Sequence, residues 1–209
     1  MKICKKARGM WLVYSHSYQT NLIDIFGYSK EVSKSITKKA KIKFKEILSD
    51  LPEFEKEDRF QLNIISCALL CAFVLSMPER PSLEDLTLFY KNGTMTSLTK
   101  FFCKKAAKHK FSTKDIENMK KSAKLKAGDR NPYSWNMEFR EYEDGSGYEA
   151  LFTQCGICTL MKKYGLYDLT PAMCAFDYTM SEAGGKTNFI RQYTLATNGP
   201  YCDCGYKKK

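Results

Sequence analysis

The spacing of hydrophobic residues changes along this 209-residue chain near the turn at residues 128–132. Before the turn, hydrophobic residues recur every three or four positions, which is typical of amphipathic helices. Directly after the turn, at residues 133–140, they alternate with polar residues, which is typical of strands buried on one face. The sequence therefore predicts an α+β fold, an N-terminal helical half packed on a C-terminal antiparallel sheet with two inserted short helices.

In the first half, spacing and start and stop signals predict helices over residues 29–51, 58–77, 82 to about 92, 98–106 and 114–126. Cys67 and Cys71 share one face of the second of these helices, where we expect them to be small core residues. The sequence does not predict a single secondary structure for residues 1–25. Trp11–Tyr14 could form a short strand or an apolar arm.

In the second half we expect strands at residues 133–139, 148–153, 189–195 and 201–206, the last two paired as a hairpin. Helices are expected at 155–164 and 170–184, the second starting with a Thr170 cap before Pro171. We predict a single domain over residues 1–209. Residues 1–130 form its basic helical half, and residues 131–209 form a cysteine-rich α+β half that carries the site.

The formal net charge of +11 originates in the first 130 residues. Their lysines are concentrated in residues 34–45 and 100–126 at helical spacing, which predicts solvated helix faces. The alternative is that these helices attract an anionic partner. We expect neither nucleic acid nor a membrane as a partner, and a homodimer is left open.

Nine cysteines, an odd number, argue against a secreted disulfide scaffold in a chain long enough to build its own core. The N-terminus lacks both the apolar run and the small-residue cleavage site of a signal peptide. The most apolar stretch, residues 62–77, contains Asn63 and Ser66 and is expected to be a core helix. We therefore expect a cytoplasmic protein whose thiols are free, metal-bound or reactive.

Two of the cysteines, Cys155 and Cys158, fall at the expected start of a helix. The free N–H groups and the dipole at such a position favour a thiolate, which would suit a nucleophile or a soft metal ligand. The alternative is a pair of small residues at a tight strand–helix junction.

Carboxylates accompany the remaining cysteines of the second half. Cys174 and Asp177 lie one helical turn apart, so the carboxylate could act as a general base or hold an amino group. The alternative is a buried cysteine beside a solvated acid. Strand alternation sends Cys202 and Cys204 to one face and Asp203 to the other, so only one of these sets can line a pocket.

We expect no cofactor, with zinc as the alternative. Its ligands would be Cys155, Cys158, Cys174 and Cys202, although their spacing is not that of a zinc finger or ribbon. The two histidines, His16 and His109, lie in the helical half, so the sequence gives no support to a Cys–His dyad.

Three ordered boxes occur in the C-terminal third: CGIC at residues 155–158, LTPAMCAFDY at 169–178 and TLATNGPYCD at 194–203. Together they resemble the L-2-amino-thiazoline-4-carboxylic acid hydrolase family of bacterial proteins. Two positions depart from the family pattern. Cys204 stands where the family has an aromatic residue, and Pro200 lies in the last turn.

The resemblance implies hydrolysis of a small C=N heterocycle derived from cysteine. Water would add at C2 of the aminothiazoline, and the ring would open to a carbamoyl-cysteine. The residues nominated as catalytic are Cys155, Cys174, Asp177 and Asp203. Those nominated for substrate binding are Cys158, Tyr178, Arg191 and Cys202.

Three roles are assigned within this set. Cys155 is the candidate nucleophile, Asp177 the candidate base or anchor for the ring nitrogen, and Arg191 the candidate partner of the substrate carboxylate. The last box is also similar to the cysteine-bearing end of small ligand-binding domains of the vinyl-reductase type. The alternative is therefore a non-enzymatic small-molecule or metal sensor that uses the same cysteine-lined pocket.

Overall fold

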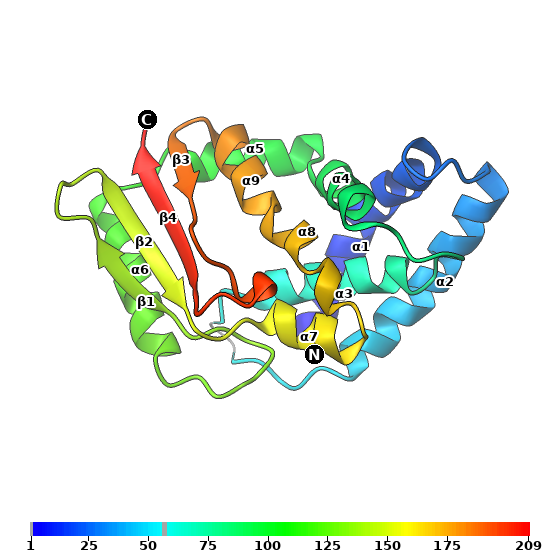
Figure 1. Ribbon diagram of the computed structural model, residues 1–209, viewed down its shortest axis with the longest axis horizontal. Helices are drawn as coiled ribbons and strands as arrows, with labels where there is room; N and C mark the ends of the chain where they lie inside the picture. The colour runs from blue at the N-terminus through cyan, green and yellow to red at the C-terminus, as the bar shows by residue number, and fades with distance from the viewer. Residues whose placement is uncertain (1, 56–57) are drawn as a thin grey trace.

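The computed structural model describes residues 2–55 and 58–209, with side chains from Lys5 onward, so the side chain of Cys4 lies outside the described residues. A set of helices comes first, followed by a four-stranded antiparallel sheet with further helices between its strands (Figure 1). The predicted α+β class is confirmed. The helices of the first half are α1 (Lys2–Asp24), α2 (Lys30–Ser49), α3 (Gln61–Val74), α4 (Leu83–Thr94), α5 (Ser97–Ala107) and α6 (Thr113–Lys126).

The first element is a helix, so both the strand and the arm considered for Trp11–Tyr14 are wrong. Helix α1 packs against α2, α3 and α4. The Trp11 ring stacks on Phe44 of α2 and Phe73 of α3, with centroids 5.9 Å away in both cases. Most helical stability comes from such tertiary packing, which the local sequence does not reveal. No helix in the described part of the chain is both long enough and apolar enough to cross a membrane.

Helix α3 is buried on nearly every side, as expected for a helix that is hydrophobic all round. It packs against α1, α2 and α7 (Gly156–Lys163). Cys67 and Cys71 are fully buried within it, and the Cys71 thiol donates to the Met161 sulfur of α7 at 3.3 Å. Both cysteines are therefore core residues, as the sequence predicts.

Helix α4 begins as predicted, because the Ser82 hydroxyl accepts the Asp85 N–H at 3.1 Å and so caps the helix. It continues through Asn92-Gly93, where the sequence predicts an end. A Cβ atom at Gly93 would lie 2.8 Å from Cδ2 of Tyr18 on α1. This glycine therefore permits close packing of two helices and does not terminate α4.

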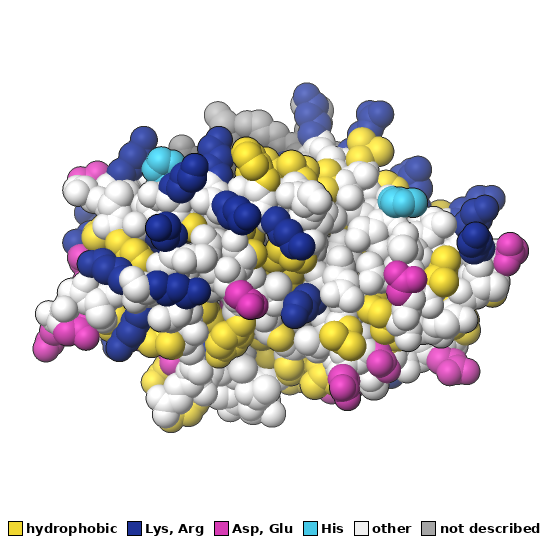
Figure 2. Space-filling view, turned by 90° about the horizontal axis from the view of Figure 1, so that it is seen from above, with side chains coloured by type: hydrophobic (Ala, Val, Ile, Leu, Met, Phe, Trp, Pro, Cys, Tyr) yellow, Lys and Arg dark blue, Asp and Glu magenta, His cyan; other side chains and the backbone are white. Residues whose placement is uncertain are grey.

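Most lysines of α2, α5 and α6 are exposed, as predicted, and Figure 2 shows basic side chains spread over the face it presents. Two lysines of the second basic run depart from this pattern. Lys126 is buried and Lys110 lines a cavity. The basic run at residues 100–126 therefore includes two lysines that point into the protein.

The sheet contains β1 (Glu138–Glu141), β2 (Gly147–Phe152), β3 (Thr187–Ile190) and β4 (Cys202–Lys208), in the order β1-β2-β4-β3. The hairpin of β3 and β4 is confirmed. Two strands are shorter than predicted. Trp135 and Met137 are buried without belonging to a strand, and β3 ends at Ile190 because the following amides bond to a side chain instead of a neighbouring strand.

The predicted inserted helices form, but the second is divided. A 3₁₀ turn (Tyr167–Leu169) leads into α8 (Pro171–Cys174), and α9 (Phe176–Gly184) follows after Ala175. The predicted Thr170 cap is wrong. Thr170 already has helical backbone angles, and its buried hydroxyl makes no capping bond. Helix α9 ends as predicted, at Gly185 in the left-handed conformation.

A buried ionic network joins the end of α6 to the segments that precede α3 and β1. The Lys126 ammonium bonds to the Asp58 carboxylate, to Asp129 Oδ2 at 2.5 Å and to Ser134 Oγ at 2.7 Å. Ser134 donates in turn to Asp58 at 2.6 Å. The Lys126 and Asp58 side chains are 6% and 2% exposed. The network fixes the loop that carries Trp135 beside the cavity described below.

Replacing this lysine tests the network. Lys126→Met should lower the free energy of unfolding by about 3–5 kcal/mol, because it leaves a buried carboxylate without its cation. Urea unfolding followed by circular dichroism measures the change. The matched control, Lys124→Met, removes an exposed lysine two residues away and should change stability by less than about 0.5 kcal/mol. Equal unfolding midpoints for the two variants would contradict the assignment.

Candidate active site

A cavity of about 460 Å³ lies between the inner face of the sheet and the helices. Figure 1 shows α8 and α9 between the sheet and helices α3 and α4. Alternate residues of two paired strands form the cavity floor: Ala150, Phe152, Cys202, Cys204 and Tyr206. Residues of α1, α3, α4 and α9 form its walls, together with residues near the start of α7 and at the end of α8.

The cavity collects most of the site residues nominated from the sequence. Those that line it are Cys155, Cys174, Asp177, Arg191 and Cys202. Those absent from its lining are Cys158, Tyr178 and Asp203. Five residues from four separate chain segments therefore meet in one place, although neither their roles nor a reaction follows from this placement alone.

Cys155 is the residue immediately before the first turn of α7, at the position whose side chain faces the free N–H groups. The thiol of Cys158 contributes most to lowering its pKa, followed by the backbone N–H groups of Cys158 and Ile157 and the indole of Trp135. Burial opposes these contributions but does not reverse them. Cys155 is therefore a thiol that the fold biases toward the thiolate.

The glycine after this thiol is required by packing. A Cβ atom at Gly156 would lie 2.1 Å from the carbonyl oxygen of Tyr133. The loop before β1 therefore rests directly on the start of α7. Because Trp135 follows two residues after Tyr133, the same contact brings the indole close to the Cys155 sulfur.

The neighbouring thiols are biased in the opposite direction. The pKa of Cys158 is raised strongly, first by the neighbouring Cys155 thiol and then by burial. Burial raises the pKa of Cys174 to about 11 and that of Cys204 to about 12, and it also raises the pKa of Cys202. The cavity therefore holds one activated thiol among protonated ones.

Arg191 is a buried cation at the middle of the cavity, with its side chain 7% exposed. Its guanidinium pairs with Asp177 of α9 and donates to the Cys174 carbonyl at 3.1 Å and to the Cys204 sulfur at 3.0 Å. Its Nε has no hydrogen-bond partner among the described residues. Burial raises the pKa of Asp177, and Arg191 only partly opposes this shift. Asp177 is therefore less acidic than an exposed aspartate although it is paired with Arg191.

Asp203 lies on the other face of β4, as alternation predicts. Its two carboxylate oxygens accept the backbone N–H groups of Gln192 at 2.8 Å and Tyr193 at 2.6 Å. The structure thus places Asp203 where it holds the chain after β3, outside the cavity. Tyr178 is also outside. It is 47% exposed, and its ring packs edge-on against Phe189 at 4.8 Å.

The cysteines proposed as zinc ligands are not arranged as a preformed metal site. Within residues 2–55 and 58–209, no group of three or more His, Cys, Asp or Glu side chains is placed to hold a metal ion. Cys158 also lies outside the cavity lining. Zinc therefore stays an untested alternative without geometric support in the described residues.

Sequence reasoning missed several residues of the cavity. Trp135 and Met137 were assigned to a strand, although their alternation does indicate two side chains that face the core. Lys110 was grouped with solvated lysines, and Tyr206 was treated only as the end of a strand. The alternation of β4 does place Tyr206 on the same face as Cys202 and Cys204.

A family model described as L-2-amino-thiazoline-4-carboxylic acid hydrolase matches residues 63–206, more than half of the chain. The chain belongs to this family. The match starts within α3 and contains β1, β2, β3 and most of β4, so it extends well upstream of the three sequence boxes. No curated protein and no solved structure matches the chain significantly.

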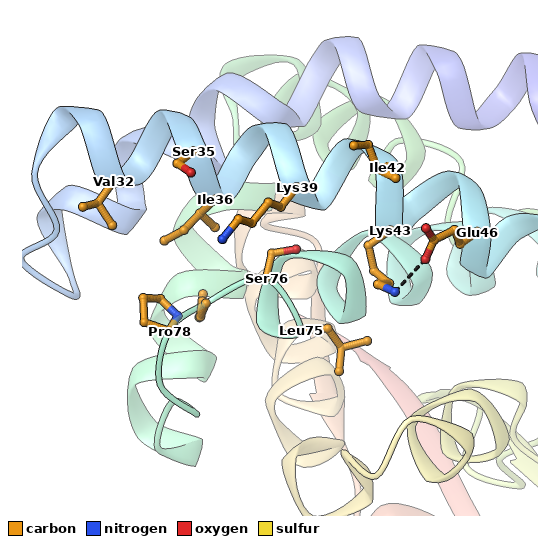
Figure 3. Close-up of a pocket in the computed structure, with 11 residues that line it drawn as sticks. Val32, Ser35, Ile36, Lys39, Ile42, Lys43, Glu46, Leu75, Ser76 and Pro78 are labelled. Atoms are coloured by element: carbon orange, nitrogen blue, oxygen red, sulfur yellow. Dashed lines mark hydrogen bonds and ion pairs between the residues drawn. The ribbon is translucent and has the colours of Figure 1, made fainter.

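This hydrolase-family chain has a second cavity, of about 490 Å³, between α2 and the turn after α3 (Figure 3). Its lining holds no cysteine and none of the residues nominated for the site. Two of its three charged side chains, Lys43 and Glu46, pair with each other at 2.6 Å. The cysteine-lined cavity is therefore the candidate active site.

The surroundings of Cys155 predict its reactivity. Trp135→Phe removes an N–H group that favours the thiolate, so the pKa of Cys155 should rise and alkylation by iodoacetamide should shift to higher pH. In the unmodified protein, the alkylation rate at Cys155 should reach half its maximum below the ordinary thiol pKa of about 8.5. Peptide mass spectrometry resolves this rate from those of the other cysteines.

Trp11→Phe is the matched control, because Trp11 stacks on α2 and α3 and does not line the cavity. Its alkylation profile should match that of the unmodified protein. A shift of equal size in both variants, or a half-maximum above the ordinary thiol value in the unmodified protein, would contradict the assignment.

Proposed function

We propose that this protein hydrolyses cyclic amidines of the L-2-amino-thiazoline-4-carboxylate type, with Cys155 as the nucleophile. The observation that carries the proposal is the Cys155 thiol at the start of α7 in a cavity that also contains Asp177 and Arg191, and the lowered pKa of this thiol supports it. Family membership supports the class of reaction.

In the proposed reaction, the Cys155 thiolate attacks C2 of the ring, and the C=N electron pair moves to the ring nitrogen, which takes a proton. The bond between C2 and the ring sulfur then breaks, and this sulfur leaves as a thiol after taking a second proton. Water attacks the same carbon and loses two protons as the C=O bond forms and Cys155 departs as a thiolate. One water is consumed, and the product is a carbamoyl-cysteine.

Asp177 is the proposed carrier of these protons. Its raised pKa favours a protonated carboxyl more than that of an exposed aspartate, which suits an acid that later acts as a base. Arg191 is the proposed partner of the ring carboxylate. The Arg191 Nε atom has no hydrogen-bond partner in the described chain, and the ion pair with Asp177 holds the guanidinium in place.

Incubation of the reduced protein with L-2-amino-thiazoline-4-carboxylate, with the product read by mass spectrometry, tests the proposal. The expected product gains one water. Cys155→Ser should lower kcat by at least about 10³-fold, because it removes the nucleophile. Asp177→Asn should lower kcat by about 10²–10⁴-fold, because an amide cannot transfer the protons.

Two conservative variants serve as controls. Cys103→Ser changes a thiol of α5, and Asp168→Asn changes an exposed acid paired with Arg80. Neither residue lines the cavity. Both variants should keep full activity. Full activity of Cys155→Ser would overturn its role, whereas tight binding without turnover, with or without added divalent metal, would favour the sensor-like module.

A further inference from the structure

The candidate active site is longer than an aminothiazoline ring requires. Cys202, Cys204 and Tyr206 occupy alternate positions on the inner face of β4. Because a strand rises about 3.3 Å per residue, the levels of Cys202 and Tyr206 are roughly 13 Å apart. Cavities of this volume usually hold ligands larger than a single five-membered ring.

The reactive thiol lies at one end of this row. Phe152, the last residue of β2, pairs with Cys202, and Cys155 follows three residues later at the start of α7. Arg191 bonds to Cys204 and therefore marks the middle of the row. A ring attacked by Cys155 would place its own carboxylate near this middle level, which leaves the Tyr206 end unused.

A cation stands at the unused end. Lys110 lies between α5 and α6, with its Nζ 3.8 Å from the Tyr206 ring centroid and donating to the Tyr148 hydroxyl at 2.7 Å. No described carboxylate forms an ion pair with Lys110. The Tyr148 hydroxyl separates Lys110 from Asp115, whose carboxylate accepts a hydrogen bond from this hydroxyl at 2.6 Å. The ammonium therefore has N–H groups left for a ligand.

The electrostatics of this end favour an added anion. Burial lowers the pKa of Lys110 to about 8, Asp115 raises it and Arg59 lowers it. Arg59 also lines the cavity and adds a second positive charge. The lysine is thus mostly charged at neutral pH but incompletely compensated, and an anion bound beside it would restore the missing counter-charge.

The backbone beside Lys110 is held in an unfavourable conformation. Phe111 has φ of 63°, in the left-handed region that residues with a Cβ atom rarely adopt. Asp115 accepts the Phe111 N–H at 2.9 Å, and the Phe111 ring packs on Tyr148 at 5.3 Å. The surrounding structure therefore maintains a strained turn where the chain directs Lys110 toward the cavity, a pattern that is common at binding sites.

We propose that the substrate of this protein is an elongated anion, in which the reacting ring is joined through its carboxyl group to a further unit whose acid group binds Lys110. One amino-acid residue adds about 3.5 Å of length and a hydrogen bond to the ammonium adds about 2.9 Å, which together match the roughly 6.6 Å between the Cys204 and Tyr206 levels. The substrate class is therefore an aminothiazoline carbonyl joined to an amino acid. The identity of the ring rests on the proposed function, whereas the acid group at Lys110 rests on the cavity alone.

Binding of ligands that resist hydrolysis tests this inference by isothermal titration calorimetry. The probes are the aromatic 2-aminothiazole-4-carboxylate, its amide with glycine, and the corresponding glycinamide, which lacks the terminal acid. The glycine conjugate should bind about tenfold more tightly than either of the other two probes, because only its acid can bond to Lys110. Equal affinity for the glycine and glycinamide conjugates would overturn the proposal.

Variants of Lys110 test whether this residue causes the preference for the glycine conjugate. Lys110→Met should abolish the tenfold preference, and Lys110→Arg should retain part of it. Lys108→Met, which removes an exposed lysine two residues away, should leave the preference intact. If Lys110→Met does not fold, as judged by circular dichroism, Lys110→Gln replaces it. An unchanged preference in the folded variant would assign the anion to another residue.

The affinities of these probes do not depend on whether the protein catalyses hydrolysis. If the proposed hydrolysis fails, a Lys110-dependent preference for the longer acid still establishes the elongated anion as the ligand of the cavity. If the short aminothiazoline is hydrolysed and the Lys110 variants bind every probe as the unmodified protein does, the proposed function stands and this inference is wrong.

Discussion

The buried guanidinium of Arg191 is the interaction on which the candidate active site depends. It joins the end of β3 to α8 through the Cys174 carbonyl, to α9 through Asp177 and to β4 through the Cys204 sulfur. Burying an unpaired cation is costly, so these partners must remain in place around it. The short, interrupted α8–α9 segment is thereby fixed against the sheet, and the cavity between them keeps its shape.

Charged and polar groups lie in three places along the cavity, and each place suits a different step of the proposed function. At one end, the start of α7 and the Trp135 indole stabilise negative charge on Cys155. In the middle, Arg191 and Asp177 neutralise each other while Asp177 keeps a raised pKa. At the other end, Lys110 has no directly bonded carboxylate among the described groups. The proposed nucleophile, proton carrier and anion contact thus lie at successive levels along β4.

The sequence predicts those elements whose apolar faces are formed by neighbouring residues, such as α2 and α4, and it predicts that Cys202 and Cys204 share one face of their strand opposite Asp203. Which of these two faces points inward does not follow from the sequence. It does not predict α1, because Trp11 and Tyr18 find their partners on distant helices. It also does not predict the position of Lys110. That lysine belongs to a run of similar residues, and the residue type of its neighbour Phe111 does not signal the left-handed backbone found there.

The contact between Gly156 and the Tyr133 carbonyl has a consequence for how substitutions act. Through this contact and the Trp135 indole, the 131–136 loop forms part of the surroundings of the reactive sulfur, although it contributes none of the family's sequence boxes. The loop is itself anchored by Ser134 to the Lys126 network. Substitutions in the 131–136 loop of relatives would therefore change the pKa of the reactive thiol while leaving the three sequence boxes unchanged.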